Sequence, residues 1–353
     1  MSLSTFTPAE AVELAVVERS GFVESRHLGS AVVLAPDGSE ILRLGAPDRP
    51  IFTRSSLKPL QAIAAMSLGA DVTGLAAALA TASHRSEAGH VAVVAEMLES
   101  AGLSASDLRC PSVHPADGAY RRSLSEVGDP KSPVHFNCSG KHAAFLRAAC
   151  AIGADTESYL DPAHPVQERV AEVVEAFSGE HPGAVGTDGC GAPVFALSLT
   201  GLARAIGRVV AMGSGTPLAE ALAPFAVHAR TLVDAVFADP WAIEGHGRPN
   251  TTVIDRLGVF AKGGAEGVIV MATRDGHALA LKCLDGSSRP TGLVALTLLR
   301  RAGALPDIGE DELTEVAGLI TDPVTGGTDS EGRTAVVGTV RVSEDAAAGG
   351  AGN

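Results

Sequence analysis

The stretch GVIVMATRDGHALALKCL, residues 267–284, decides the fold class. Two apolar runs flank Asp275-Gly276, and an Asp-Gly pair readily adopts the positive φ angles that a tight hairpin turn requires. Because strand signals of this kind gather at both chain ends, we expect one antiparallel sheet built from the two ends. The other strand segments are VELAVVER at 12–19, AVVLAPDGSEILRL at 31–44 with its own Asp37-Gly38, and TAVVGTVRV at 334–342.

The middle of the chain shows apolar residues three and four positions apart, the spacing of amphipathic helices. Helices are expected at 87–102, 140–153, 166–177 and 217–237, and a further one at 291–303 is expected to pack on the sheet. The sequence therefore predicts an α/β (α+β) fold with a large helical insert. The expected layout is a single domain over 1–353, with sheet from about 12–45 and 265–342, a helical part at about 55–260 and a disordered tail at 344–353.

The composition excludes several classes of protein. The chain has 27 Lys and Arg against 41 Asp and Glu, a net charge of −14, which disfavours a nucleic-acid binder. Charge-free runs such as residues 189–203 are too short to span a membrane, and the N-terminus lacks the pattern of a secretory signal. Five scattered cysteines do not form a disulfide framework. We therefore expect a cytoplasmic protein without membrane or nucleic-acid partners.

The run FTRSSLKPLQ contains Ser55-x-x-Lys58, directly before an apolar stretch. Residues three apart share a helix face, so a helix starting near Ser55 would bring Lys58 toward its hydroxyl. A serine needs a base to become a nucleophile, and a lysine serves only where its pKa is lowered. The alternative is a serine that caps the helix and a lysine exposed one turn later.

Two further runs carry groups of the same kind. Ser83 follows an alanine-rich stretch in TASHRSE, and Lys262 precedes two glycines in FAKGGAEG, just before a strand. Glycines there allow the backbone to approach a ligand closely. The alternatives are a capping serine at a helix end and a surface lysine beside a glycine-rich strand start. Each run alone is a weak signal.

The loops NCSGKHAAF (137–145) and GTDGCGAP (186–193) hold potential metal ligands. Cys138, His142, Asp188 and Cys190 are residue types that bind zinc, but their spacing is not that of paired C-x-x-C motifs. The cysteines are equally compatible with small buried apolar residues. Spacing alone leaves both interpretations open.

The order of the runs is more informative than any one of them. S-x-x-K, a second serine and a lysine-glycine pair on a late strand resemble the motif set of serine β-lactamases and penicillin-binding proteins. The runs RSSLKPLQ, ASH, NCSGKHAAFL, GTDGCGAP and KGGAEG together resemble the rhizobial-type (class 3) L-asparaginases of the asparaginase II family. The resemblance implies a β-lactamase-like fold, a homodimer and hydrolysis of L-asparagine to L-aspartate and ammonia.

The resemblance also implies roles for individual residues. By it, Ser55 and Lys58 form the first catalytic pair, and Ser83 and Lys262 form the second. The remaining residues are expected to bind zinc (Cys138, Lys141 and Cys190) or the substrate (Arg54, His142, Asp188 and Gly263). Because a lysine must lose its proton to bind a metal, zinc occupancy is expected to depend on pH.

The hypothesis for catalysis is that Ser55 attacks the side-chain amide, Lys58 takes its proton, and Ser83 with Lys262 passes a proton to the leaving ammonia. Two neighbouring lysines lower each other's pKa. The exchange of roles, with Ser83 as the nucleophile, stays open. So do two rival functions: a hydrolase of another amide (glutamine, a D-peptide or a β-lactam), or a non-catalytic zinc- or amino-acid-binding relative.

Overall fold

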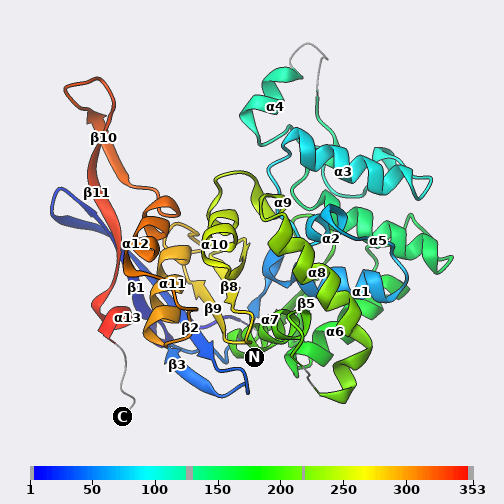
Figure 1. The fold of residues 1–353 in the computed structure, drawn as a ribbon, viewed down its shortest axis with the longest axis horizontal. Helices are drawn as coiled ribbons and strands as arrows, with labels where there is room; N and C mark the ends of the chain where they lie inside the picture. The colour runs from blue at the N-terminus through cyan, green and yellow to red at the C-terminus, as the bar shows by residue number, and fades with distance from the viewer. Residues whose placement is uncertain (1–3, 125–129, 217–218, 349–353) are drawn as a thin grey trace.

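The computed structural model describes residues 4–124, 130–216 and 219–348. Its main feature is an eight-stranded antiparallel sheet with the order β10-β11-β1-β2-β9-β8-β7, and β3 pairs with β2 beside this path. The first and last strands along the chain therefore share one sheet (Figure 1). Its strands are β1 (Val12–Arg19), β2 (Phe22–Leu34), β3 (Glu40–Leu44), β7 (Phe260–Gly264), β8 (Val268–Ala272), β9 (Ala278–Cys283), β10 (Val324–Thr328) and β11 (Thr334–Val342).

Both Asp-Gly turns predicted from the sequence are confirmed. Asp37-Gly38 lies between β2 and β3, and Asp275-Gly276 lies between β8 and β9, where Ala272 pairs with Ala278. Gly276 has φ +103°, a conformation that glycine adopts without strain. The antiparallel sheet from both chain ends is thus the observed architecture.

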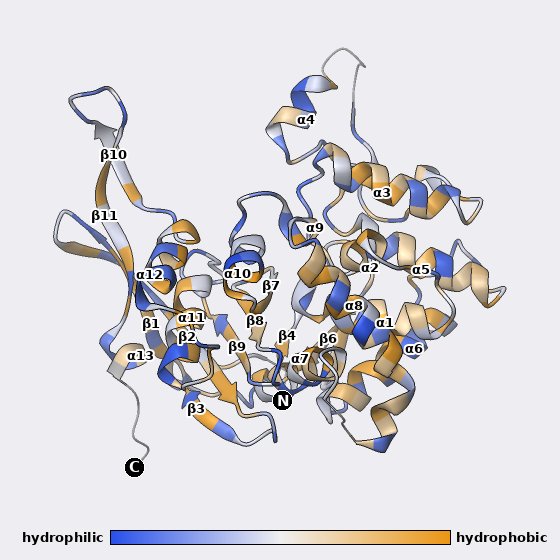
Figure 2. Cartoon of the chain, in the orientation of Figure 1, coloured by the Kyte–Doolittle hydropathy of each residue, from blue (hydrophilic) through white to orange (hydrophobic). Residues whose placement is uncertain are grey.

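Helices cover the central strands. Every residue of β8 and β9 is buried, which requires apolar cover on both faces. α7 (Leu199–Gly213) and α11 (Thr291–Arg301) both pack on these two strands. Figure 2 shows mainly apolar colouring in this region of the sheet. α11 agrees with the helix predicted at 291–303, whereas α7 was not among the predicted helices.

The helical part stands beside the sheet (Figure 1). α1 is buried from Lys58 to Met66 and contacts α5, α6 and α8. With only 4% aromatic residues in the chain, this core is filled mainly by Ala, Val and Leu. Its helices are α1 (Lys58–Ser67), α2 (Leu75–Ala80), α3 (Ala88–Glu99), α4 (Gly118–Ser123), α5 (Ser139–Ala151), α6 (Pro165–Ser178), α8 (Ala226–Ala238), α9 (Trp241–Glu244) and α10 (Pro249–Leu257).

A small second sheet lies within the part expected to be helical. Its order is β4-β6-β5, formed by β4 (Ile51–Phe52), β5 (Ala184–Thr187) and β6 (Pro193–Leu197). Phe52 pairs with Ala196, so the chain that leads into the S-x-x-K run lies beside the GTDGCGAP loop. This pairing brings two motifs about 130 residues apart into one site.

Three expectations need correction or qualification. The helix predicted at 217–237 is a 3₁₀ turn, η5 (Glu220–Phe225), followed by α8, and residues 217–218 lie outside the described part. The tail predicted to be disordered begins with α13 (Glu344–Ala348), where the Arg301 side chain donates to Ala346 O at 2.7 Å and Ala346 is buried. Residues 349–353 of that tail lie outside the described part. α12 (Glu310–Leu319) was not expected.

One described stretch, Glu220–Ala238, is long and apolar enough to cross a membrane by length and composition. A core helix of a soluble protein passes the same test, so this single stretch is weak evidence. Its α8 half buries Leu232, Val233 and Val236 against neighbouring helices.

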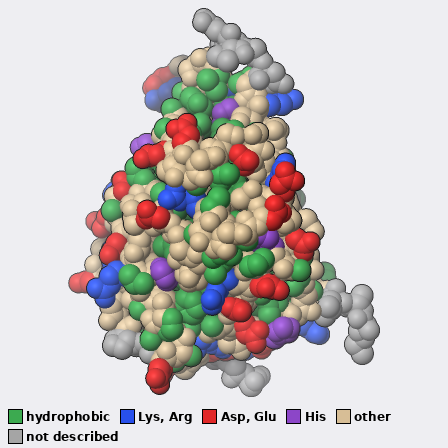
Figure 3. All heavy atoms as spheres, turned by 90° about the vertical axis from the view of Figure 1, so that its right-hand side faces the viewer, with side chains coloured by type: hydrophobic (Ala, Val, Ile, Leu, Met, Phe, Trp, Pro, Cys, Tyr) green, Lys and Arg blue, Asp and Glu red, His purple; other side chains and the backbone are tan. Residues whose placement is uncertain are grey.

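On the face shown in Figure 3, acidic and basic side chains are interspersed, so the negative charge is not gathered in one patch there.

Candidate active site

Lys58 is buried and turned toward the second serine. It is the first residue of α1 and is 1% exposed, which excludes the alternative of a surface lysine. Its Nζ donates hydrogen bonds to Ala82 O and, at 3.1 Å, to Ser83 Oγ. Ser55 lies in a 3₁₀ turn, η2 (Arg54–Leu57), and the backbone N–H of Lys58 donates to Ser55 O. Within the described residues no side-chain hydrogen bond joins Lys58 Nζ to the Ser55 hydroxyl.

Ser83 lies where three distant segments meet. It follows α2, and its backbone N–H donates to Ile243 O at 2.8 Å. Lys262 on β7 donates from Nζ to Ser83 Oγ at 2.8 Å and to Gly263 O at 2.9 Å. The Ser83 hydroxyl is therefore held by two buried lysine amines, one from the helical part and one from the sheet.

The two lysines make this cluster a candidate for proton transfer. Burial first and the nearby charge of Lys58 second, against an opposing effect of Glu244, lower the pKa of Lys262 to about 7. An amine with a pKa near neutrality can both accept and return a proton under physiological conditions. Lys262 is thus suited to act as a base above pH 7 and as an acid once protonated.

Both serines line a single cavity of about 350 Å³ between the helical part and the sheet. Gly263 and Gly264 on β7 also line it, and substrate binding by Gly263 stays a prediction. Its charged residues, none of which belongs to the motifs predicted from the sequence, are Glu244, Arg248, Arg289 and Asp322. The segment EGHGRPN (244–250), in which charged residues flank two glycines, was the available signal. The polar lining also includes the side chains of Asn137, Asn250, Ser288 and Thr291.

The residues expected to bind zinc converge. Lys141 Nζ donates to Cys190 Sγ at 3.1 Å, and the Cys190 thiol hydrogen-bonds Cys138. That hydrogen bond, together with the charges of Lys58 and Lys141, holds the pKa of Cys138 well below its usual range. Gly140 lets α5 pack closely on α2, because a Cβ there would lie 2.3 Å from Leu79 O. Among the described residues, no group of three or more His, Cys, Asp or Glu forms a metal cluster, and here the third donor is a lysine.

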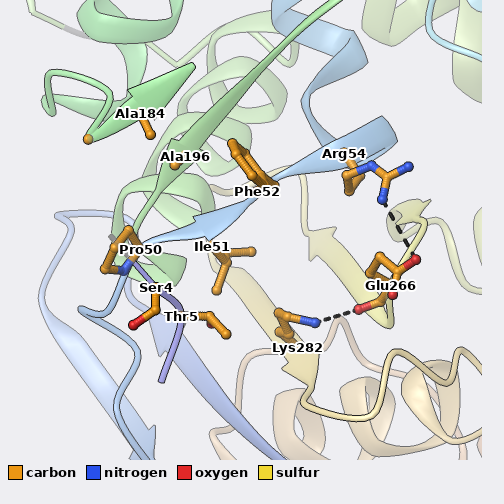
Figure 4. Close-up of a pocket in the computed structure, with 11 residues that line it drawn as sticks. Ser4, Thr5, Pro50, Ile51, Phe52, Arg54, Ala184, Ala196, Glu266 and Lys282 are labelled. Carbon is orange, nitrogen blue, oxygen red and sulfur yellow. Dashed lines mark hydrogen bonds and ion pairs between the residues drawn. The ribbon is translucent and has the colours of Figure 1, made fainter. Parts of the chain in front are cut away.

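Arg54 and Asp188 form a half-buried ion pair beside the thiols. Arg54 Nε donates to Asp188 Oδ1 at 2.7 Å, and Cys190 Sγ lies 3.8 Å from Asp188 Oδ2. Burial raises the pKa of Asp188, but the bond from Arg54, the charge of Lys141 and a backbone hydrogen bond from Gly189 together outweigh it, so the net pKa is lowered. Arg54 has φ +51° and lines a separate cavity of about 280 Å³, shown in Figure 4 with Glu266 and Lys282.

His142 lies away from the cavity that holds the serines. Its Nδ1 is 2.7 Å from the Tyr159 hydroxyl, which accepts the Arg109 N–H at 2.9 Å. Its Nε2 is buried without a hydrogen-bond partner among the described residues. His142 adjoins Lys141 on α5, so its place is beside the thiols.

A family model described as L-asparaginase II matches residues 15–341. The chain belongs to the L-asparaginase II family. The match spans nearly all of both the sheet and the helical part, and it confirms the resemblance found in the motifs. The L-asparaginase II family is one of amidohydrolases.

Crystal structures of a protein named Mglu resemble this chain only weakly. Its native form is 14% identical, with 80% of this chain and 66% of that chain covered and a TM-score of 0.44. The glutamate form gives 14% identity, 80% and 62% coverage and a TM-score of 0.44. The chain thus spans under two thirds of the length of these Mglu chains, and the scores carry no argument about function. No curated protein matches.

Proposed function

We propose that the protein is an L-asparaginase that hydrolyses L-asparagine to L-aspartate and ammonia through an acyl-enzyme. The observation that carries the proposal is the Ser83 hydroxyl, bonded by two buried lysines in the cavity that Ser55 also lines. The fold we propose for this site is serine β-lactamase-like, supported by the sheet from both chain ends and the helical insert. A homodimer and a cytoplasmic location stay predictions from the resemblance and the free cysteines.

The first half-reaction is the attack of Ser55 Oγ on the side-chain carbonyl carbon. The proton that leaves Ser55 enters the cluster of Ser83, Lys58 and Lys262, where neutral Lys262 is the acceptor. The oxyanion is stabilised by backbone N–H groups, which we assign to Ser55 and its neighbours. Protonated Lys262 then returns a proton through Ser83 to the departing ammonia, leaving an aspartyl ester on Ser55.

The second half-reaction reverses these roles. Water attacks the ester, and the Ser83–Lys262 pair accepts the proton of the water. The ester bond breaks, Ser55 recovers its proton from the cluster, and L-aspartate leaves. The four groups Ser55, Lys58, Ser83 and Lys262 are all present, which speaks against a non-catalytic relative.

Zinc is the proposed metal, held by Cys138, Lys141 and Cys190. The fit rests on the donor set: two contacting thiols, one with a lowered pKa, and an amine 3.1 Å from Cys190 Sγ. A bound zinc would supply a fixed positive charge beside the substrate cavity. Without metal, burial lowers the pKa of Lys141, but the charges of Cys190 and Cys138 outweigh it and the net pKa is raised. Zinc binding must therefore displace a proton from this lysine.

Cys190→Ser is expected to lower the zinc content of the purified protein at least about tenfold, since a thiolate ligand becomes a weakly binding hydroxyl. Cys283→Ser is the matched control, because Cys283 is a buried free thiol on β9 and is not part of the zinc set. Elemental analysis after dialysis measures both. A wild-type protein that binds no zinc, or a Cys190→Ser protein that retains it, contradicts the assignment.

Ammonia release from L-asparagine and L-glutamine tests the proposed function directly. We expect release from L-asparagine at a kcat/KM above that for L-glutamine, because the resemblance is to asparaginases. If activity is higher with L-glutamine, a D-peptide or a β-lactam, the proposed catalytic residues stand, but the substrate is that other amide and not L-asparagine. The absence of ammonia from both amino-acid amides would remove the asparaginase proposal.

A further inference from the structure

The cavity that holds the serines contains a cation with no assigned partner. Arg248 lines it, is half-buried, and has a buried Nε with no hydrogen-bond partner among the described residues. No described residue forms an ion pair with its guanidinium. A buried unsatisfied guanidinium group is costly, and a carboxylate is the ligand that offsets the cost most fully.

Arg248 is held in a fixed position relative to Ser83. Ser83 N–H donates to Ile243 O at 2.8 Å, and Arg85 N–H donates to Glu244 O at 3.1 Å. The chain then turns at Gly245, with φ +128°, and the Arg248 N–H closes the turn on Gly245 O at 3.3 Å. The backbone that carries the guanidinium is therefore bonded to the backbone that carries the catalytic hydroxyl.

The other cations near the serines are less suitable. Arg54 is engaged by Asp188 at 2.7 Å and lines the separate cavity of Figure 4. Arg289 lines the serine cavity but is exposed, so water screens its charge. Lys58 and Lys262 both bond the Ser83 hydroxyl. Arg248 alone combines partial burial, an open donor and a fixed link to Ser83.

Glu244 adds the opposite charge on the same turn. Its Oε2 accepts from Asn250 N and Nδ2, both at 3.0 Å, while Oε1 has no hydrogen bond within the described residues. Glu244 also lines the cavity and is close enough to Lys262 to oppose the lowering of that pKa. A carboxylate on this side repels a substrate carboxylate and attracts an ammonium group. The two charges thus match those of an amino acid.

We propose that Arg248 binds the α-carboxylate of the substrate and so restricts the enzyme to amides of amino acids. The inference rests on the proposed function and deepens it, because it assigns a specificity-determining residue to the same cavity. The guanidinium fork engages both carboxylate oxygens and orients the side-chain amide toward the serines. An amide that lacks the α-carboxylate gains nothing from this contact.

The test compares L-asparagine with 3-aminopropanamide, which is asparagine without its α-carboxylate. Arg248→Met is expected to lower kcat/KM for L-asparagine roughly 100-fold and to change that for 3-aminopropanamide less than about threefold. Arg248→Lys is expected to recover part of the preference, because the charge stays and the fork is lost. Arg289→Met, which removes one positive charge from the exposed part of the same cavity, is expected to leave the ratio of the two substrates unchanged.

Two outcomes overturn the inference. Equal losses on both substrates in Arg248→Met would indicate a structural role, and a selective loss in Arg289→Met would place the carboxylate at the other arginine. Calorimetric titration with L-aspartate and with 3-aminopropanoate provides a readout that needs no turnover. The wild-type protein could release no ammonia and still bind L-aspartate more tightly than Arg248→Met does. That result would support the inference while the asparaginase proposal fails.

Discussion

Replacing Lys262 by Met is expected to lower kcat about 10³-fold while the protein stays folded. The variant keeps a buried side chain of similar length but removes the amine that contacts Ser83 Oγ at 2.8 Å. The wild-type pH profile carries a second signature. Below pH 7 Lys262 is charged and cannot accept a proton, so kcat/KM should rise as the pH passes through about 7 and then level off. Steady-state ammonia release between pH 5 and 10 measures both effects.

The matched control for Lys262 is Lys282→Met. Lys282 is also a buried lysine of the sheet with a pKa lowered by burial, but its Nζ bonds the carbonyls of Glu266 at 2.7 Å and Cys283 at 3.0 Å. Its loss should alter thermal stability and leave the pH profile in place. A flat wild-type profile between pH 6 and 9, or equal loss of kcat in both variants, would argue against Lys262 as the base.

Replacing either serine by Ala is expected to reduce turnover on the order of 10³-fold or more, with different effects on the covalent intermediate. Ser55→Ala should abolish the acyl adduct, because the attacking oxygen is gone. Ser83→Ala should still acylate Ser55, slowly, because only the proton path is broken. Acid quenching during turnover followed by peptide mass spectrometry locates the adduct.

Ser56→Ala is the control for the serine variants. Ser56 adjoins Ser55 in η2, but it is buried and its hydroxyl donates to Thr53 O at 2.6 Å. We expect near wild-type acylation in this variant. An adduct found on Ser83 in the wild-type protein would exchange the roles of the two serines, and absence of any adduct with intact turnover would sink the covalent route.

Local chemistry made much of the fold predictable. The Asp-Gly turns and the strand at 334–342 depend on a few adjacent residues, and they lie where the sequence indicates. The small sheet escaped prediction because β4 has only two residues and every residue of β6 is buried, so neither shows an alternating pattern. β10 reads VTGGT, in which glycines mask the strand signal.

The candidate site, like the fold, was predictable from the sequence only in part. The motif residues Ser55, Ser83 and Gly263 line one cavity, but the partner of Lys58 depends on where α1 begins. Spacing within an ideal helix pointed to Ser55, whereas the Lys58 side chain bonds Ser83, which is distant in the sequence. The segment EGHGRPN alone does not place Arg248 in the cavity, because its position depends on the pairing of residues 83–85 with 243–244. Only the folded chain brings those segments together.

The sheet built from both chain ends sets the order of events during synthesis. β2 emerges early from the ribosome, yet its partner β9 follows about 250 positions later, as the pairing of Gly29 with Cys283 requires. Until then β2 lacks that neighbour, and Ser83 lacks the amine of Lys262 on β7. A nascent chain should therefore stay inactive and dependent on chaperones until most of it has been made. Release of an intermediate ending before β7 would give an aggregation-prone fragment with half of a proton relay.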